Sequence, residues 1–161
     1  MPAPATAFVH VEVVHPDPDG AAAFIIEELG GERVERGISS YLEGLAPEGE
    51  LQVIHVRLGN VVFQLVKPPA LPGLESWYEQ LRDHGPSVHN VTVFVDGVED
   101  VRQRLLARGA TQAAELDLTL QDAGLDVQGT QKVHVLDARE QTGLRFELLE
   151  TIPSWVPGKG P

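Results

Sequence analysis

Four polar residues interrupt stretches that otherwise read as apolar strands, and their side chains could do chemistry. They are His10 in FVHVEVV, Gln64 in VVFQLV, Asn90 in VHNVTVFV and Glu147 in LRFELLE. An imidazole, an amide or a carboxylate in an apolar strand costs free energy unless it is hydrogen-bonded, exposed to water or bound to a ligand. Taken one at a time, the four residues leave all three explanations open.

The four residues occupy equivalent places in an internal repeat. Residues 8–17 read FVHVEVVHPD and residues 88–97 read VHNVTVFVDG, and an Ala/Leu-rich stretch ending in glycine follows each. A second pair, VVFQLVKP at 61–68 and LRFELLET at 144–151, recurs toward the close of each half. The repeat matches His10 with Asn90 and Gln64 with Glu147, which indicates a duplicated structural module and a shared site.

Period-two alternation predicts the strands that carry these residues. In the first strand it sets Val9, Val11 and Val13 on one face, and His10 and Glu12 on the other. Proline and glycine then mark the ends of the helices. The first half predicts, in order, a strand at 8–14, a helix at 20–29, a β-prone piece at 33–42, and strands at 51–58 and 61–66. The second half predicts a strand at 89–95, a helix at 98–108, and strands near 114–120, 131–136 and 144–150.

The predicted fold class is therefore α+β, with two tandem βαβββ modules that form a curved mixed-sheet cleft. The first module covers residues 8–66 and the second covers residues 88–151. Residues 67–87 form a linker with a short amphipathic helix around Trp77 and Leu81. We expect the six valines at 9, 11, 13, 91, 93 and 95 to pack against the two module helices.

Composition and charge exclude several classes of function. The chain has 161 residues, 42% of them hydrophobic, which can fill the core of one compact domain. A formal net charge of -12 argues against nucleic acids and anionic membranes as partners. The absence of cysteine rules out disulfides and thiolate metal sites. No leader-like segment and no run of eighteen apolar residues is present, so a cytoplasmic protein is expected.

Several motifs make the chain resemble the vicinal oxygen chelate superfamily, and within it the methylmalonyl-CoA epimerase family. The resemblance covers residues 8–151. It rests on HVEVVHPD in the first strand, Pro47-Glu48 placed so that Glu48 lies sixteen residues before Gln64, Trp77 followed by GPSVHNV at 85–91, and Gly143 followed by the Glu147-Leu148 pair.

The resemblance implies a metal site and a reaction. Its metal ligands would be His10, Gln64, Asn90 and Glu147, holding a divalent ion such as Co, Zn, Mn, Ni or Mg. Glu48 would be the general base, with Glu147 as a second catalytic residue, and the reaction would be removal of a proton next to a carbonyl by an isomerase or epimerase. The resemblance also implies an acyl-CoA as substrate. The exposed strand edges of the predicted architecture favour a homodimer. A second acid or base for inversion is not evident.

Departures from the family pattern keep other functions open. Asn90 stands where the family has histidine, and regular alternation predicts that the neighbouring His89 points to the opposite face. Glu50 rivals Glu48 as the base, and His55 is a candidate for the missing imidazole. The alternatives are a non-catalytic small-molecule binding or resistance protein of the same fold, or a dioxygenase, although the usual two-histidine iron site would then lack one imidazole. An acyl-CoA would need basic residues at the rim of the cleft, for which the candidates are Lys67, Arg82, Arg139 and Arg145.

Overall fold

A computed structural model describes residues 5–35, 46, 47, 49–119 and 130–150 of the chain. The first βαβββ series consists of β1 (Ala5–Val14), α1 (Pro18–Leu29), β2 (Glu32–Arg33), β3 (Gln52–Leu58) and β4 (Val61–Lys67). Helix α3 (Glu75–His84) connects it to the second series. The second series consists of β5 (Ser87–Val95), α4 (Val98–Ala107), β6 (Thr111–Thr119), β7 (Thr130–Ala138), the short helix α5 (Arg139–Thr142) and β8 (Leu144–Glu150).

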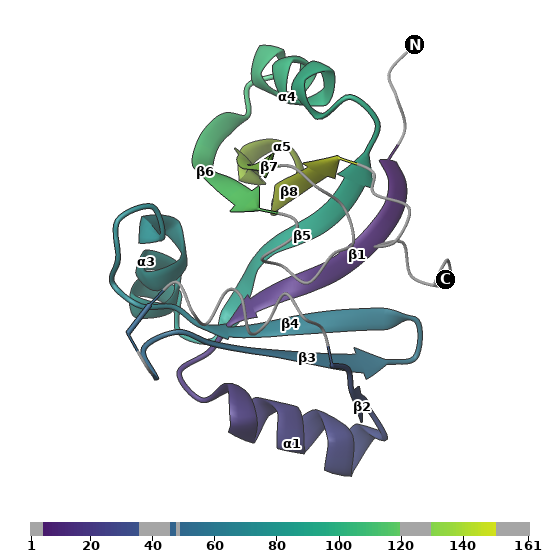
Figure 1. Cartoon of the computed structure of the whole chain (residues 1–161), viewed down its shortest axis with the longest axis vertical. Coiled ribbons are helices and arrows are strands. Elements are labelled where there is room, and N and C mark those ends of the chain that lie inside the picture. Colours follow the sequence, from purple (N-terminus) through teal and green to yellow (C-terminus); the bar gives the residue numbers. More distant parts are fainter. Residues whose placement is uncertain (1–4, 36–45, 48, 120–129, 151–161) are drawn as a thin grey trace.

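The strands form one mixed sheet in the order β2-β3-β4-β1-β5-β8-β7-β6 (Figure 1). The first strands of the two series, β1 and β5, are antiparallel neighbours at the centre. Each has the last strand of its own series as its parallel partner on the other side. The predicted α+β class and repeated βαβββ order are confirmed. The first and last strands of both series, β4, β1, β5 and β8, therefore lie side by side at the centre of the sheet.

Helices α1 and α4 cover the same face of the sheet, one on each half. Helix α1 contributes Ala22 to a buried cluster with Ile54, Val56 and Leu65. Helix α4 contributes Val98 to a second cluster with buried residues of the other half, among them Val95, Leu136 and Leu148. Leu65 follows Gln64 and Leu148 follows Glu147 in their strands, so these polar side chains face the other way.

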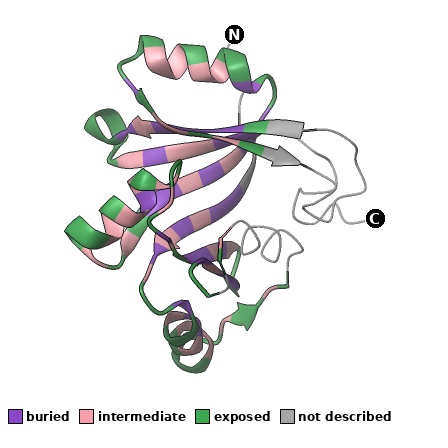
Figure 2. Cartoon of the chain, turned by 60° about the vertical axis from the view of Figure 1, so that its left-hand side comes forward, coloured by how far each residue is buried: buried purple, intermediate pink, exposed green. Residues whose placement is uncertain are grey.

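The predicted valine packing is correct only in part. Val13 packs in the α1 cluster, and Val93 and Val95 pack in the α4 cluster. Val11 and Val91 lie opposite one another on the two central strands and are half-buried. Figure 2 shows the reason, because α1 and α4 lie toward the two ends of the sheet and leave its middle less covered.

Helix α3 lies on the opposite face, which we call the site face. Its Trp77 is buried in a cluster with Val14 of β1 and Val135 of β7. The linker helix therefore spans strands of both halves and covers part of the face that carries the polar residues. No helix in the described part of the chain is long and apolar enough to cross a membrane.

Candidate functional site

The predicted site residues come together on the site face of four adjacent strands. His10 and Glu12 come from β1, Gln64 from β4, Asn90 and Thr92 from β5, and Glu147 from β8. The strand register sets Glu12 beside both Gln64 and Asn90. It sets Thr92 beside both His10 and Glu147. Residues about fifty to eighty positions apart in the sequence therefore lie side by side on neighbouring strands.

This register obeys the symmetry of the repeat. Exchanging the two halves turns the pair His10–Thr92 into the pair Asn90–Glu12, and both pairs occur in the β1–β5 ladder. The same exchange turns the pair Glu12–Gln64 into Thr92–Glu147, and both of these pairs occur as well. Glu12 and Thr92 are thus a third pair of equivalent positions.

A matching irregularity precedes His10 and Asn90. The β1–β5 register shifts between Phe8 and His10, and again between Asn90 and Val88, so that Val9 and His89 each occupy a bulge. A bulge allows consecutive side chains to point to the same side. His89 and Asn90 are accordingly both buried, at 1% and 0% exposure. The prediction that His89 points to the opposite face is wrong, because it assumed a regular pleat.

Three of the site residues form a cluster suited to a metal ion. Each residue of the cluster offers one ligand atom, and these three atoms lie within 4.8 Å of one another in His10, Glu12 and Glu147. An imidazole nitrogen and two carboxylate oxygens are donors that divalent ions such as Zn, Mn or Co accept. The two acids would bring two negative charges to the ion. The donor set therefore fits the divalent metal that the fold family implies.

Burial makes both carboxyl groups hard to ionise when no cation is bound. Burial raises the pKa of Glu12 from 4.5 to about 7, against the opposing effect of hydrogen bonds from Trp77 and Asn90. Burial, and then repulsion from Glu12, raises the pKa of Glu147 well above its usual value. As a whole residue Glu147 keeps intermediate exposure, while its carboxyl group belongs to the enclosed cluster. A divalent cation would relieve both the desolvation and the repulsion.

The linker helix reaches directly into this cluster. The indole Nε1 of Trp77 donates a hydrogen bond to Oε1 of Glu12. The indole ring also stacks on the ring of His89, with centroids 4.3 Å apart and planes at 14°. On the other side of His89, its Nε2 lies 3.0 Å from the hydroxyl of Ser76. Helix α3 thus orients one candidate ligand and fixes the bulged histidine.

Asn90 is held in the same network. Its Nδ2 lies 2.9 Å from Nδ1 of His89, and its Oδ1 accepts a hydrogen bond of 3.0 Å from the hydroxyl of Thr92. Burial, followed by the positive charges of Arg145 and Arg139, lowers the pKa of His89 to about 3, so the ring is neutral. A neutral Nδ1 accepts from the amide, which leaves the proton on Nε2 to donate to Ser76.

Thr92 connects these residues to the cluster. Its hydroxyl lies 2.9 Å from Nε2 of His10 and 3.4 Å from Oε1 of Glu147. Because a hydroxyl has a single proton, it donates to one neighbour at a time and accepts from another. Thr92 therefore couples the orientation of the imidazole to that of the carboxyl group.

Some of the residues predicted from the sequence belong to the metal-competent cluster, and others lie beside it or outside the described residues. His10 and Glu147 belong to the cluster, while Gln64 and Asn90 are buried beside Glu12 on the neighbouring strands. Glu48 lies outside the described residues. Its rival Glu50 is exposed, in a turn where its N–H donates to the carbonyl of Pro47.

His55, the candidate for the missing imidazole, and His89, next to Asn90, have different surroundings. His55 is buried on the site face opposite Gln64, with its ring 5.7 Å from the ring of His10. His89 lies on the same face, but both of its nitrogens are within hydrogen-bond distance of protein side chains. Neither belongs to the metal-competent cluster in the described part of the chain.

Alternation predicts that Glu12 and Thr92 face the cleft with His10 and Asn90, but neither they nor Trp77 were predicted as metal ligands or catalytic residues. The alternation in β1 did place Glu12 on the same face as His10, two positions away, and this His-x-Glu spacing is the signal for a second donor. The equivalence of Glu12 and Thr92 in the repeat adds to it. For Trp77 no sequence signal distinguishes a site residue from an ordinary core residue of an amphipathic helix.

Comparison with solved structures identifies the fold. Methylmalonyl-CoA epimerase from Mycobacterium tuberculosis superposes with a TM-score of 0.61 over 93% of this chain and 91% of its own, at 18% sequence identity. A Streptomyces coelicolor methylmalonyl-CoA epimerase variant, in complex with 2-nitronate-propionyl-CoA, gives 0.61 over 92% and 99%, at 14% identity. The chain has the vicinal oxygen chelate fold. A hypothetical protein from Bacillus halodurans C-125 shares this fold, with a TM-score of 0.62 over 90% of this chain and 94% of its own, at 14% identity.

Sequence comparison adds nothing to the assignment of the vicinal oxygen chelate fold. No family model matches the chain, and no curated protein matches it by sequence. At identities of 14% to 18% the superpositions establish the fold alone. The activity has to be argued from the side chains.

Proposed function

We propose that this protein is a metal-assisted isomerase or epimerase that removes a proton next to the carbonyl of an acyl thioester. The observation that carries the proposal is the buried cluster of His10, Glu12 and Glu147, located where the two halves of the sheet meet. Two carboxyl groups with raised pKa values beside an imidazole are unfavourable in a purely structural core. Such an arrangement is retained when a cation or a reacting group uses it.

The residues of the chain divide the work as follows. His10, Glu12 and Glu147 would hold the divalent ion, and Gln64 and Asn90, which flank Glu12 on the neighbouring strands, would add amide oxygens to its coordination. When bound, the ion would polarise a carbonyl oxygen and so acidify the adjacent C–H group. Trp77 and Thr92 would orient the ligands through the hydrogen bonds that they make to Glu12 and to His10.

Glu48 is the proposed base, as the resemblance to the epimerase family implies. A carboxylate that is not bound to the cation keeps its lone pairs available for a proton from carbon, and Glu48 would have this role while Glu147 holds the ion. The substrate class is suggested by the structural neighbours, since methylmalonyl-CoA epimerases have been solved with methylmalonyl-CoA and with 2-nitronate-propionyl-CoA.

Solvent deuterium exchange tests this proposal. The protein is loaded with Co²⁺ or Mn²⁺ and incubated in D₂O with a panel of 2-substituted acyl-CoA thioesters and keto compounds, and ¹H NMR follows the α-proton. We expect loss of the α-proton signal from at least one thioester. Glu48→Gln should slow the exchange about a hundredfold, the usual range for a general base, whereas the matched control Glu50→Gln should leave it unchanged. No exchange with any compound by metal-loaded protein would refute the proposal.

One observation favours a second candidate, a non-catalytic binding protein of the same fold. The amide of Asn90, which replaces the expected imidazole, is engaged with His89 and Thr92 inside the protein. A site that has lost a strong nitrogen donor binds transition metals less tightly. Ligand binding with unchanged α-proton signals would favour this candidate.

A further inference from the structure

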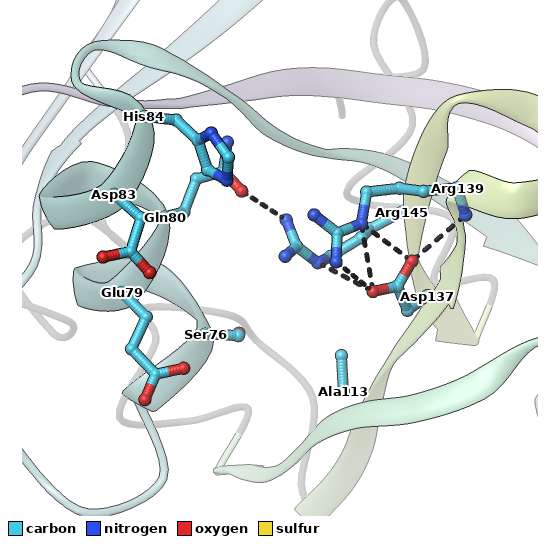
Figure 3. A pocket seen from close by; sticks show the side chains of 9 residues that line it. All are labelled: Ser76, Glu79, Gln80, Asp83, His84, Ala113, Asp137, Arg139 and Arg145. Atoms are coloured by element: carbon cyan, nitrogen blue, oxygen red, sulfur yellow. Dashed lines mark hydrogen bonds and ion pairs between the residues drawn. The ribbon is translucent and has the colours of Figure 1, made fainter.

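A cavity lies between α3 and the end of the sheet where β7 turns into β8. Its volume is about 290 Å³, and it shares no residue with the metal-competent cluster. Gln80 and Asp83 of α3 line one side, while Asp137, Arg139 and Arg145 line the other (Figure 3). Two of the four basic residues considered at the sequence level thus meet at one cavity, in a chain with a net charge of -12.

Arg145 has a hydrogen-bonding capacity that the described residues do not fill. The residue is 6% exposed, and its Nη1 donates to Oε1 of Gln80 at 3.0 Å and to the backbone carbonyl of His89 at 3.3 Å. Its buried Nε has no hydrogen-bond partner among the described residues, since the nearer oxygen of Asp137 lies 3.6 Å away. An unsatisfied buried donor is costly, and a guanidinium more so.

The charged groups around Nε of Arg145 carry an excess of positive charge. Asp137 is already bound by Arg139, whose Nε and Nη2 donate to its oxygens at 3.0 and 2.7 Å. Two guanidinium groups therefore share one carboxylate, which leaves one positive charge uncompensated on this wall. Burial, and next repulsion from Arg139, lowers the pKa of Arg145, although a guanidinium remains charged.

The outer part of the cavity limits which anion can enter. Glu79 and Asp83 are exposed on the α3 side, and Asp83 is bound by Arg82 at 2.7 Å. These carboxylates oppose a dianion more than a monoanion. Arginine pairs with a planar carboxylate through parallel N–H bonds, and the cavity has room for only a small molecule.

We propose that this cavity binds the carboxylate group of a small organic acid, which pairs with the guanidinium groups of Arg145 and Arg139. The site uses neither the metal nor the cluster, so it stands independently of the proposed isomerase activity. The ligand would supply negative charge beside two arginines that share the single carboxylate of Asp137.

Side-chain NMR tests the site on the metal-free, ¹⁵N-arginine-labelled protein. Acetate and inorganic phosphate are titrated separately at constant ionic strength, and the Nε–Hε signals are assigned by Arg145→Lys and Arg139→Gln. We expect acetate to shift both signals saturably, with a dissociation constant of about 1 to 10 mM, as suits a ligand with few atoms. Arg139→Gln should weaken binding about tenfold, in keeping with the loss of a charge-assisted hydrogen bond. The control Arg102→Gln, which alters an arginine paired with Glu99 on α4, should leave it unchanged.

Three results would overturn the proposal. The first is the absence of a saturable shift at Arg145 in the wild-type protein, which requires no variant to fold. The second is an equal shift of all arginine signals, which would report a general salt effect. The third is saturable binding of phosphate without binding of acetate, which would replace the carboxylate by a phosphate group.

Discussion

Replacing Glu12 by glutamine should stabilise the metal-free protein at high pH while it destroys the metal site. Glutamine keeps the shape of the side chain, and its oxygen can still accept the indole hydrogen bond of Trp77. It removes the charge that burial opposes and that contributes to the raised pKa of Glu147. The variant therefore separates the effect of the buried carboxylate on the free energy of unfolding from its effect on metal binding.

The sign and size of the effect follow from the pKa of Glu12. Its folded-state value of about 7 lies above the ordinary value of 4.5, so the folded protein binds its proton more tightly than the unfolded chain does. The stability that this proton contributes is fully present below pH 4.5 and is lost as the pH rises through about 7. At 1.36 kcal/mol per pKa unit, the loss amounts to roughly 3 kcal/mol as an upper bound. We expect Glu12→Gln to recover about 1 to 3 kcal/mol at pH 8 and almost nothing at pH 4.

Urea unfolding in the presence of EDTA, at several pH values between 4 and 8, measures this difference between the wild type and the variant. Adding Co²⁺ at pH 8 should reverse their order, because only the wild type gains binding energy from the ion. A variant that is less stable than the wild type at pH 8 in EDTA would refute the electrostatic reasoning. A difference that does not change with pH would refute it as well.

Two further substitutions test the remaining contacts. Trp77→Phe removes the hydrogen bond to Glu12 and should weaken metal binding about tenfold in a calorimetric titration, as loss of a ligand-orienting partner commonly does. The control Tyr78→Phe, on the same helix, should leave the affinity unchanged. Equal metal affinities of the wild type and Trp77→Phe would show that Trp77 does not support the site. Asn90→His should raise zinc or cobalt affinity by about tenfold, or 1.4 kcal/mol, because an imidazole is the better donor for these ions. A lower affinity of the variant than of the wild type would show that the hydrogen bonds lost with the amide outweigh the stronger metal–nitrogen bond.

Local patterns in the sequence predicted the main helices and strands, but not the short helix α5, and most of the predicted β-prone piece at 33–42 lies outside the described residues. The alternation around His10 and Asn90 defines β1 and β5, and glycines such as Gly30, with φ of +73°, end helices where the left-handed conformation is required. The repeat then related the two halves, because equivalent residues in a duplicated module occupy equivalent places. His10 and Glu147 could be assigned to one site on this basis.

The rest of the site depends on contacts that no local pattern encodes. The bulge at His89 comes from the register between β1 and β5, which joins residues about eighty positions apart, and period-two alternation cannot anticipate it. Trp77 reaches Glu12 only because α3 packs on the site face. Glu12 becomes a candidate ligand only because the strand order brings its carboxyl group close to the ligand atoms of His10 and Glu147.

Calorimetric titration of the metal-free protein with Co²⁺ tests most directly whether the buried cluster is a metal site. We expect one ion per chain, with an enthalpy that depends on the ionisation heat of the buffer, because Glu12 and Glu147 must release protons as the ion binds. Glu147→Gln should weaken binding about a hundredfold or more, through loss of a charged ligand, whereas the exposed control Glu140→Gln should bind as the wild type does. Absence of binding, or equal binding by Glu147→Gln, would contradict a metal centre at His10, Glu12 and Glu147.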